Sequence, residues 1–246
     1  MDKLSKQRFW EIDFFRGLAI IMMIIFHFFY DLNYFGVQRI DLRSGFWWIF
    51  GRMIATTFIL LVGISLTLSY SRVKKHKTGW KLFKKYFVRG VKIFGLGLIV
   101  TLITWVFLKK GFIIFGILHF IGISIILAYP FLKHRFLNFL LGIIFIIVGL
   151  YIENLIFNSY WFIWTGLKPN YFYTVDYFPI FPWFGVILFG LFLGNLLYPN
   201  GKRKLKIGNL SNFSFVKLFC FLGRNSLVIY LMHQPILVIF LYIFVL

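Results

Sequence analysis

One face of the first apolar segment carries ionisable side chains. Arg16, His27 and Asp31 lie in or beside a run that is otherwise apolar from about residue 14 to residue 36. On a helix of about 100° per residue, the three side chains fall within about 60° of one another. Ionisable groups at membrane depth are costly and face protein or water, so we expect this face to be functional.

His27 and Asp31 have the types and spacing of a general base and the carboxylate that orients it. Residues four apart on a helix are neighbours. A neutral imidazole aimed by a carboxylate can take a proton from a hydroxyl or an amine. The alternative for Asp31 is an ion pair with Arg52 that joins the first two helices.

The elements that position these groups are membrane helices. Of 246 residues, 61% are hydrophobic and only 14% are charged, which is typical of an integral membrane protein. The sequence predicts an all-α, polytopic helical bundle forming one domain over residues 1–246. Its seven expected spans, each of about 20 apolar residues, are 14–36, 46–70, 87–108, 112–132, 136–152, 179–198 and 224–245.

Lys and Arg predict the orientation of these spans. The N-terminus and the alternate loops that share its side carry 19 of them, and the opposite loops carry five. By the positive-inside rule the N-terminus is cytoplasmic and the C-terminus extracytoplasmic, in a multi-pass protein of the cell membrane. This distribution accounts for the net charge of +20 without a nucleic-acid partner. We expect no cleavable signal peptide, so the first helix acts as the insertion signal.

Two stretches outside the spans have two interpretations each. The basic segment 71–90 is a topology signal, or it attracts an anionic cytosolic substrate such as a nucleotide-bearing thioester. The aromatic segment 151–177 is an interfacial belt, or a lid that stacks on a sugar.

Further polar groups are distributed along the other predicted helices. His119 and His233, taken singly, are equally well explained as hydrogen-bonded packing residues. No two histidines have the close spacing of a helical metal site, and the single cysteine, Cys220, excludes a thiolate cluster, so no metal is expected. The residues that we expect to bind acyl-CoA or substrate are Arg16, Arg52, His119, Arg224, Asn225, His233 and Gln234.

Five blocks of the sequence resemble a known family. They begin at Glu11 (EIDFFRGLAIIMMIIFHFFYDLNYFG), Gly51 (GRMIATTFILLVGISLTLSYSR), Phe115 (FGILHFIGIS), Asp176 (DYFPIFPWFGVILFGLFLGN) and Leu222 (LGRNSLVIYLMHQP). Together they resemble the heparan-alpha-glucosaminide N-acetyltransferase catalytic-domain family of small prokaryotic membrane proteins. The ten residues between Arg16 and His27 are also similar to the spacing in acyltransferase 3 type membrane enzymes, where the histidine is essential.

The resemblance implies acyl transfer from cytosolic acyl-CoA to an acceptor reached from the other side of the membrane. His27 would be the base, and Arg16 would lie at the cytosolic side of the thioester site. The lysosomal branch has its catalytic histidine in the first external loop, whereas residues 37–46 contain none, so a glucosaminide acceptor is not implied. Seven spans are also fewer than acyltransferase 3 type enzymes have.

We therefore expect a transmembrane acyltransferase with acetyl-CoA as donor and a sugar or lipid-linked glycan as acceptor. Arg52, His119 or Asn225 would donate hydrogen bonds to the oxyanion. Membrane lipids are the other expected partners, and a homodimer is left open. A non-enzymatic transporter of protons or a polar solute, with the same histidine and aspartate as a relay, is the alternative. A purely structural scaffold protein is the third possibility.

Overall fold

The computed structural model describes residues 8–42, 44–108 and 110–245, and this part of the chain is built from helices without a β-strand. Six of the helices found in it are long and apolar enough to cross a membrane. This confirms an all-α, multi-pass membrane bundle. The six are α1 (Trp10–Tyr34), α2 (Gly45–Val73), α3 (Gly79–Leu108), α5 (Phe136–Glu153), α6 (Ile180–Leu197) and α8 (Ser226–Phe244).

The chain divides into two compact units. The first unit comprises Met1–Leu61 and Lys206–Leu246, and the second comprises Val62–Leu205. Helix α2 contributes its N-terminal half to the first unit and its C-terminal half to the second.

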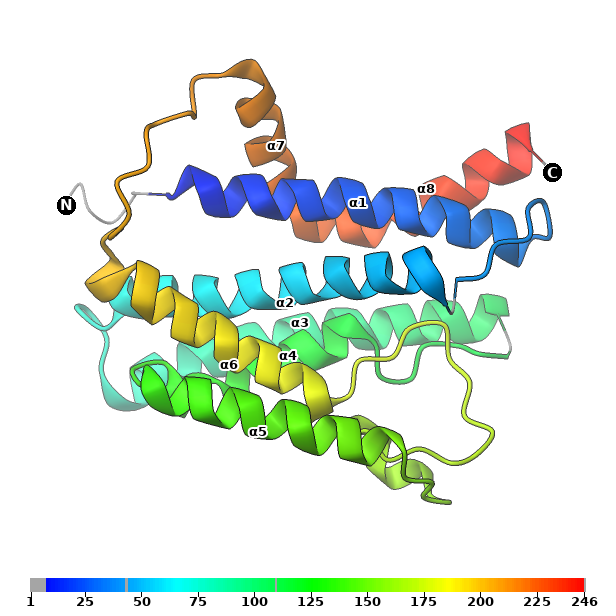
Figure 1. Ribbon diagram of the computed structural model, residues 1–246, viewed down its shortest axis with the longest axis horizontal. Helices are drawn as coiled ribbons and strands as arrows, with labels where there is room; N and C mark the ends of the chain where they lie inside the picture. The colour runs from blue at the N-terminus through cyan, green and yellow to red at the C-terminus, as the bar shows by residue number, and fades with distance from the viewer. Residues whose placement is uncertain (1–7, 43, 109, 246) are drawn as a thin grey trace. The chain divides into compact units, whose positions relative to one another are not determined.

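The first unit is organised around α1. Its small core joins Ile20 and Met23 of α1 to Ile54 of α2, and Ile229 and Tyr230 of α8 pack against it. Figure 1 shows α8 (red) running beside the second half of α1 (blue). Residues of α2 and α8, which are far apart in the chain, are therefore both held against α1.

A short helix between the predicted spans 179–198 and 224–245 also packs on α1. This is α7 (Ser214–Arg224), in orange in Figure 1. The close approach of α7 to α1 requires glycine at position 17, because a Cβ there would lie 2.0 Å from the carbonyl oxygen of Phe219. The helix is too short and too polar to cross a membrane, and the last membrane-spanning helix, α8, begins only at Ser226. Its buried residues, spaced three or four apart, are Val216, Phe219, Cys220 and Gly223.

Close helix contacts through glycine also build the second unit. Helix α3 packs on α4 (Ile117–Leu127), where a Cβ on Gly122 would lie 2.6 Å from the backbone nitrogen of Phe94. Helix α5 packs on α6, where a Cβ on Gly185 would lie 2.7 Å from the carbonyl oxygen of Gly142. Small residues let membrane helices approach closely enough for extensive van der Waals contact.

The fourth predicted span, 112–132, is helical for only part of its length. Helix α4 has 11 residues, and the chain before it is extended. The extended backbone is paired: Val175 N donates to Gly111 O at 2.9 Å, and Phe178 N donates to Phe115 O at 3.0 Å. Non-helical backbone within a membrane protein is tolerated where protein groups satisfy it in this way. Because α4 is too short to count as a full span, the predicted number of seven spans is not confirmed.

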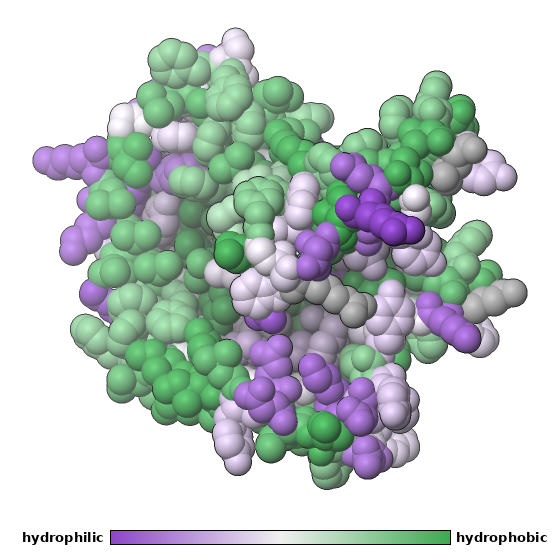
Figure 2. Space-filling view, turned by 45° about the vertical axis from the view of Figure 1, so that its right-hand side comes forward, coloured by the Kyte–Doolittle hydropathy of each residue, from purple (hydrophilic) through white to green (hydrophobic). Residues whose placement is uncertain are grey.

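The basic segment 71–90 and the aromatic segment 151–177 are both ordered. The basic segment 71–90 forms the end of α2 and the start of α3 around a turn, so it continues the spans. The aromatic segment contains the 3-10 helix η3 (Tyr160–Thr165) and exposes several large rings. Figure 2 shows apolar side chains (green) over much of the visible surface, as expected where helices face lipid.

Candidate active site

His27 lies in the middle of α1 with its ring fixed by the backbone. Its Nδ1 is 2.9 Å from the carbonyl oxygen of Met23, one turn earlier. A carbonyl only accepts hydrogen bonds, so Nδ1 carries the proton and Nε2 is the basic atom of the neutral ring. A tautomer fixed in this way suits a general base.

His233 of α8 packs against His27. The ring centroids are 4.7 Å apart and the rings meet edge to face at 82°. The Nδ1 of His233 is hydrogen-bonded to the carbonyl oxygen of Tyr230, so this ring too has a basic Nε2. His233 is only 8% exposed. The two histidines, 206 positions apart in sequence numbering, thus form one contact pair.

Asp31 and Gln234 form the polar contact next to this histidine pair. The Nε2 of Gln234 donates to Oδ1 of Asp31 at 2.6 Å. Asp31 is 2% exposed. The four-residue spacing predicts that Asp31 orients His27, but in the structure the backbone carbonyl of Met23 occupies Nδ1 and Asp31 pairs with Gln234.

Hydrogen-bond acceptors dominate this group. Among the buried side-chain atoms without a hydrogen-bond partner in the described part of the chain, three belong to this group: Oδ2 of Asp31, Oε1 of Gln234 and Nε2 of His233. Buried polar atoms without partners are uncommon and often mark functional sites. Atoms of this kind can accept a proton or the N–H and O–H groups of an entering molecule. We call His27, Asp31, His233 and Gln234 the histidine cluster.

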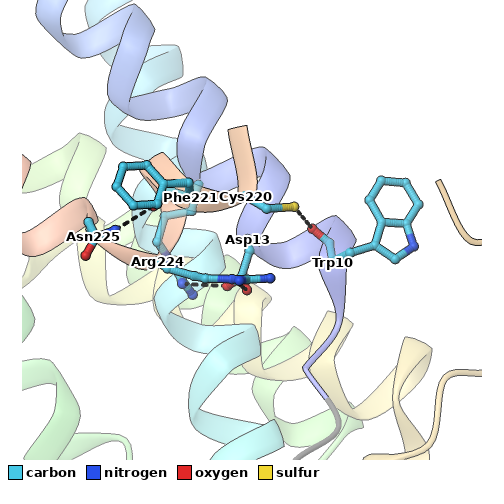
Figure 3. A network of polar contacts seen from close by, with 7 residues as sticks. Trp10, Asp13, Cys220, Phe221, Arg224 and Asn225 are labelled. Atoms are coloured by element: carbon cyan, nitrogen blue, oxygen red, sulfur yellow. Dashed lines mark hydrogen bonds and ion pairs between the residues drawn. The ribbon is translucent and has the colours of Figure 1, made fainter. Parts of the chain in front are cut away.

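Arg16 and Arg224 meet at the other end of α1. Arg16 Nη1 lies 3.3 Å from Oδ1 of Asp13, and Arg224 Nε lies 3.3 Å from Oδ2 of the same carboxylate. Figure 3 shows Asp13 facing Arg224 of α7, with the Cys220 thiol directed at the carbonyl of Trp10. Asp13 is not among the site residues expected from the sequence, although its spacing of three residues from Arg16 favours this contact.

Asn225 and Arg52 of the first unit are also engaged. The Asn225 side chain donates to the carbonyl oxygen of Phe221 at 2.9 Å and so caps the end of α7 (Figure 3). The Arg52 guanidinium lies over the ring of Trp48, 4.5 Å from its centroid. The ion pair with Asp31 that we considered for Arg52 is replaced by the contact between Asp31 and Gln234.

His119 belongs to the second unit, where it caps α4. Gly116 N donates to its Nδ1 at 3.3 Å, so Nε2 carries the proton and faces Oγ1 of Thr101 at 3.3 Å. Thr101 in turn donates to the carbonyl oxygen of Ile113 at 2.7 Å. Both ring nitrogens thus hold the start of α4, which is a structural role.

Asp176 occupies the same helix start. Its Oδ2 accepts a hydrogen bond from the backbone nitrogen of Ile117 at 3.0 Å. Burial raises the pKa of this carboxyl to about 6, and the hydrogen bond from Ile117 opposes that shift. Across the described residues, the acidic, histidine and cysteine side chains form no group of three or more that could hold a metal ion.

Comparison with protein families identifies the family of this chain. The family model described as heparan-alpha-glucosaminide N-acetyltransferase, catalytic, matches residues 8–235. The chain belongs to this family. The match extends from the start of α1 past His233 and Gln234, so it includes the whole histidine cluster. Family membership identifies a transmembrane acetyltransferase in general terms. No curated protein and no solved structure matches the chain.

Proposed function

We propose that residues 1–246 act as one domain that transfers an acetyl group from cytosolic acetyl-CoA to a hydroxyl or amine of an acceptor. The acceptor is extracytoplasmic or embedded in the membrane, and a sugar or lipid-linked glycan is the class that we favour. The supporting observation is the fixed tautomer of His27, whose ring contacts His233 beside the buried pair of Asp31 and Gln234.

In the proposed step, Nε2 of His27 takes the proton of the acceptor O–H or N–H. The acceptor oxygen or nitrogen forms a bond to the thioester carbonyl carbon, and the C–S bond breaks. The CoA thiolate then takes the proton from the His27 imidazolium, which restores the neutral ring. Transfer through an acetyl group on His27 uses the same atoms in two steps.

The remaining site residues divide by position along the helices. Arg16 lies about 16 Å from His27 along α1, and Asn225 lies about 12 Å from His233 along α8. Arg16, Arg224 and Asn225 are therefore proposed for the donor side, near the acyl-CoA. Asp31, His233 and Gln234 would contact the acceptor, and Arg52 remains the proposed oxyanion donor in the first unit.

The proposed donor side requires a cytoplasmic N-terminus and an extracytoplasmic C-terminus. The excess of Lys and Arg in the loops on the N-terminal side supports this orientation. In a Cys220→Ser background, Lys77→Cys should react with impermeant maleimide only from the cytoplasmic side. Asn170→Cys should react only from outside, and the reverse pattern would contradict the orientation.

Coenzyme A release from the purified protein in lipid tests the transfer itself. With acetyl-CoA and a panel of amine, sugar and glycolipid acceptors, His27→Ala should lower the rate by about 10²–10⁴-fold. The matched control is His76→Ala, which removes an exposed histidine between α2 and α3. Turnover of His27→Ala at the wild-type rate would exclude His27 as the base.

The transporter alternative would use the same cluster as a proton relay. Membership of an acetyltransferase family favours transfer. Proton or solute flux in liposomes that depends on His27, without CoA release for any acceptor, would favour transport instead.

A further inference from the structure

Three cations gather where α2 ends and α3 begins, within the second unit. Arg72 lies in the last turn of α2, and Lys85 and Arg89 are four residues apart on α3. The Nζ of Lys85 donates to Oγ of Ser69 at 3.1 Å, which connects the two helices. The charges that act most strongly on Lys85 are those of Arg89, Lys77 and Arg72, all positive.

No carboxylate of the described residues pairs with these cations. The sequence contains no Asp or Glu from Leu42 to Ile152. Among the described residues, neither Arg72, Lys85 nor Arg89 takes part in an ion pair. Like charges held together on packed helices repel one another, so an anionic ligand would be bound favourably.

Hydroxyl groups complete the set. Tyr86 is 0% exposed, and its hydroxyl lies beside Ser69 and within electrostatic range of Arg89. Arg72 uses its Nε to donate to the carbonyl oxygen of Leu68 at 3.2 Å, which fixes the guanidinium while its other N–H groups can still donate. Two guanidinium groups, one ammonium and two hydroxyls are all suited to the oxygens of a phosphate group.

Neighbouring aromatic residues indicate the depth of this group. Trp80 is 72% exposed on the first turn of α3, and its ring contacts Phe83, which contacts Phe87 in turn. Exposed aromatic residues at the end of a span are typical of the lipid headgroup region. A phosphate at this level can come from a phospholipid headgroup or from the nucleotide part of an acyl-CoA.

We propose that Arg72, Lys85 and Arg89, with the hydroxyls of Ser69 and Tyr86, form a binding site for a phosphate group. A topology signal alone needs only positive charge near the end of a span, at any exposed position. It does not require a half-buried lysine bonded to a serine of the neighbouring helix. The proposal therefore predicts that binding depends on which cation is removed.

Binding to the purified full chain in phosphate-free detergent tests the site. The probes are acetyl-CoA, its 3′-dephospho form and short-chain phosphatidylglycerol, each titrated without an acceptor. Arg89→Gln should weaken binding of acetyl-CoA or phosphatidylglycerol by about tenfold, as expected for loss of one charge-assisted contact. The matched control is Lys75→Gln, an exposed lysine of the intervening turn, which should change binding by less than about twofold.

The probes distinguish the two sources of phosphate. Loss of acetyl-CoA affinity, with weak wild-type binding of the 3′-dephospho form, assigns the site to the nucleotide. Loss of phosphatidylglycerol affinity alone assigns it to a lipid headgroup. Equal weakening by Arg89→Gln and Lys75→Gln, or no weakening by Arg89→Gln, would overturn the proposal. Arg89 is exposed, so this variant does not depend on the contact between Lys85 and Ser69.

The binding test is independent of the proposed reaction. Binding is titrated without an acceptor, so it is measured in the absence of any transfer. A failure of acetyl transfer and a failure of phosphate binding can therefore be told apart.

Discussion

The side chain of Gln234 donates a hydrogen bond to Asp31 at 2.6 Å and so joins the last helix of the chain to the first. The contact fixes α8 lengthwise against α1. Because His233 precedes Gln234 directly, the same register brings its ring against His27. One polar contact between distant segments thus assembles the histidine cluster.

Replacing Gln234 by Leu should destabilise the protein. The change removes the donor to Asp31 and leaves a buried carboxyl without its partner, at a cost of about 1–3 kcal/mol. Thermal unfolding in detergent measures the effect. Gln234→Glu keeps the shape of the side chain but also lacks the N–H donor, so it should be destabilised as well. A Gln234→Leu variant as stable as the wild type would show that the hydrogen bond contributes nothing.

His233→Phe separates packing from chemistry at the histidine pair. Phenylalanine retains a ring that can meet His27 edge to face, but it removes both nitrogens. We expect a folded protein whose rate of acetyl transfer is lower by about tenfold or more, with an altered pH–rate profile. An unchanged rate and profile would mean that His233 only packs against His27.

Gly17→Ala should loosen α7 from α1. The added Cβ would lie 2.0 Å from the carbonyl oxygen of Phe219, and overpacking of this kind costs about 1–3 kcal/mol. Cys220 reports the change, because it is 3% exposed and its thiol donates to the Trp10 carbonyl. Burial, assisted by the Asp13 carboxylate, also raises the pKa of this thiol, so it should react slowly in the wild type.

Maleimide labelling of Cys220 should therefore be faster in Gly17→Ala than in the wild type. Gly95→Ala is the matched control, since a Cβ on this helical glycine meets nothing within 4 Å. Equal labelling rates in all three proteins would contradict the close contact between α1 and α7.

Asp176 should make stability depend on pH. The folded protein holds the Asp176 proton with a pKa of about 6, whereas an unfolded carboxyl titrates near pH 4. Between about pH 4 and 6 the folded state binds more protons, so the free energy of unfolding falls as pH rises. Asp176→Asn should lack this decline, and the exposed Glu153→Gln should retain it; identical profiles for the wild type and Asp176→Asn would refute the assignment.

The membrane helices could be predicted because hydropathy is a local property of the sequence. The expected spans agree with α1, α2, α3, α5, α6 and α8 to within a few residues at most ends, with α3 beginning earlier. Helix α7 was missed because its apolar face packs on α1, which is distant in the sequence. The shortening of α4 depends on the pairing of residues 111–115 with 175–178, which local patterns do not reveal.

The site could be predicted only in part. His27 and His233 fall near the middle of the predicted spans 14–36 and 224–245, and the structure brings their rings into contact. The hydrogen bond of His27 could not be foreseen, because a backbone carbonyl competes with Asp31 for the same nitrogen. The hydrogen bond from Gly116 N to His119 Nδ1 could not be foreseen either, because glycine and histidine are not the usual residues of a capping box.

The glycine contacts between helices have an evolutionary consequence. At Gly17, Gly63, Gly122 and Gly185 even one extra methyl group would meet the backbone of the partner helix. Lipid-facing positions such as Leu102 and Val106 are exposed and can exchange among apolar residues. Substitutions should therefore accumulate quickly on the outside of the bundle and very slowly at these glycines. Divergent relatives should keep the glycines after most of the apolar surface has changed.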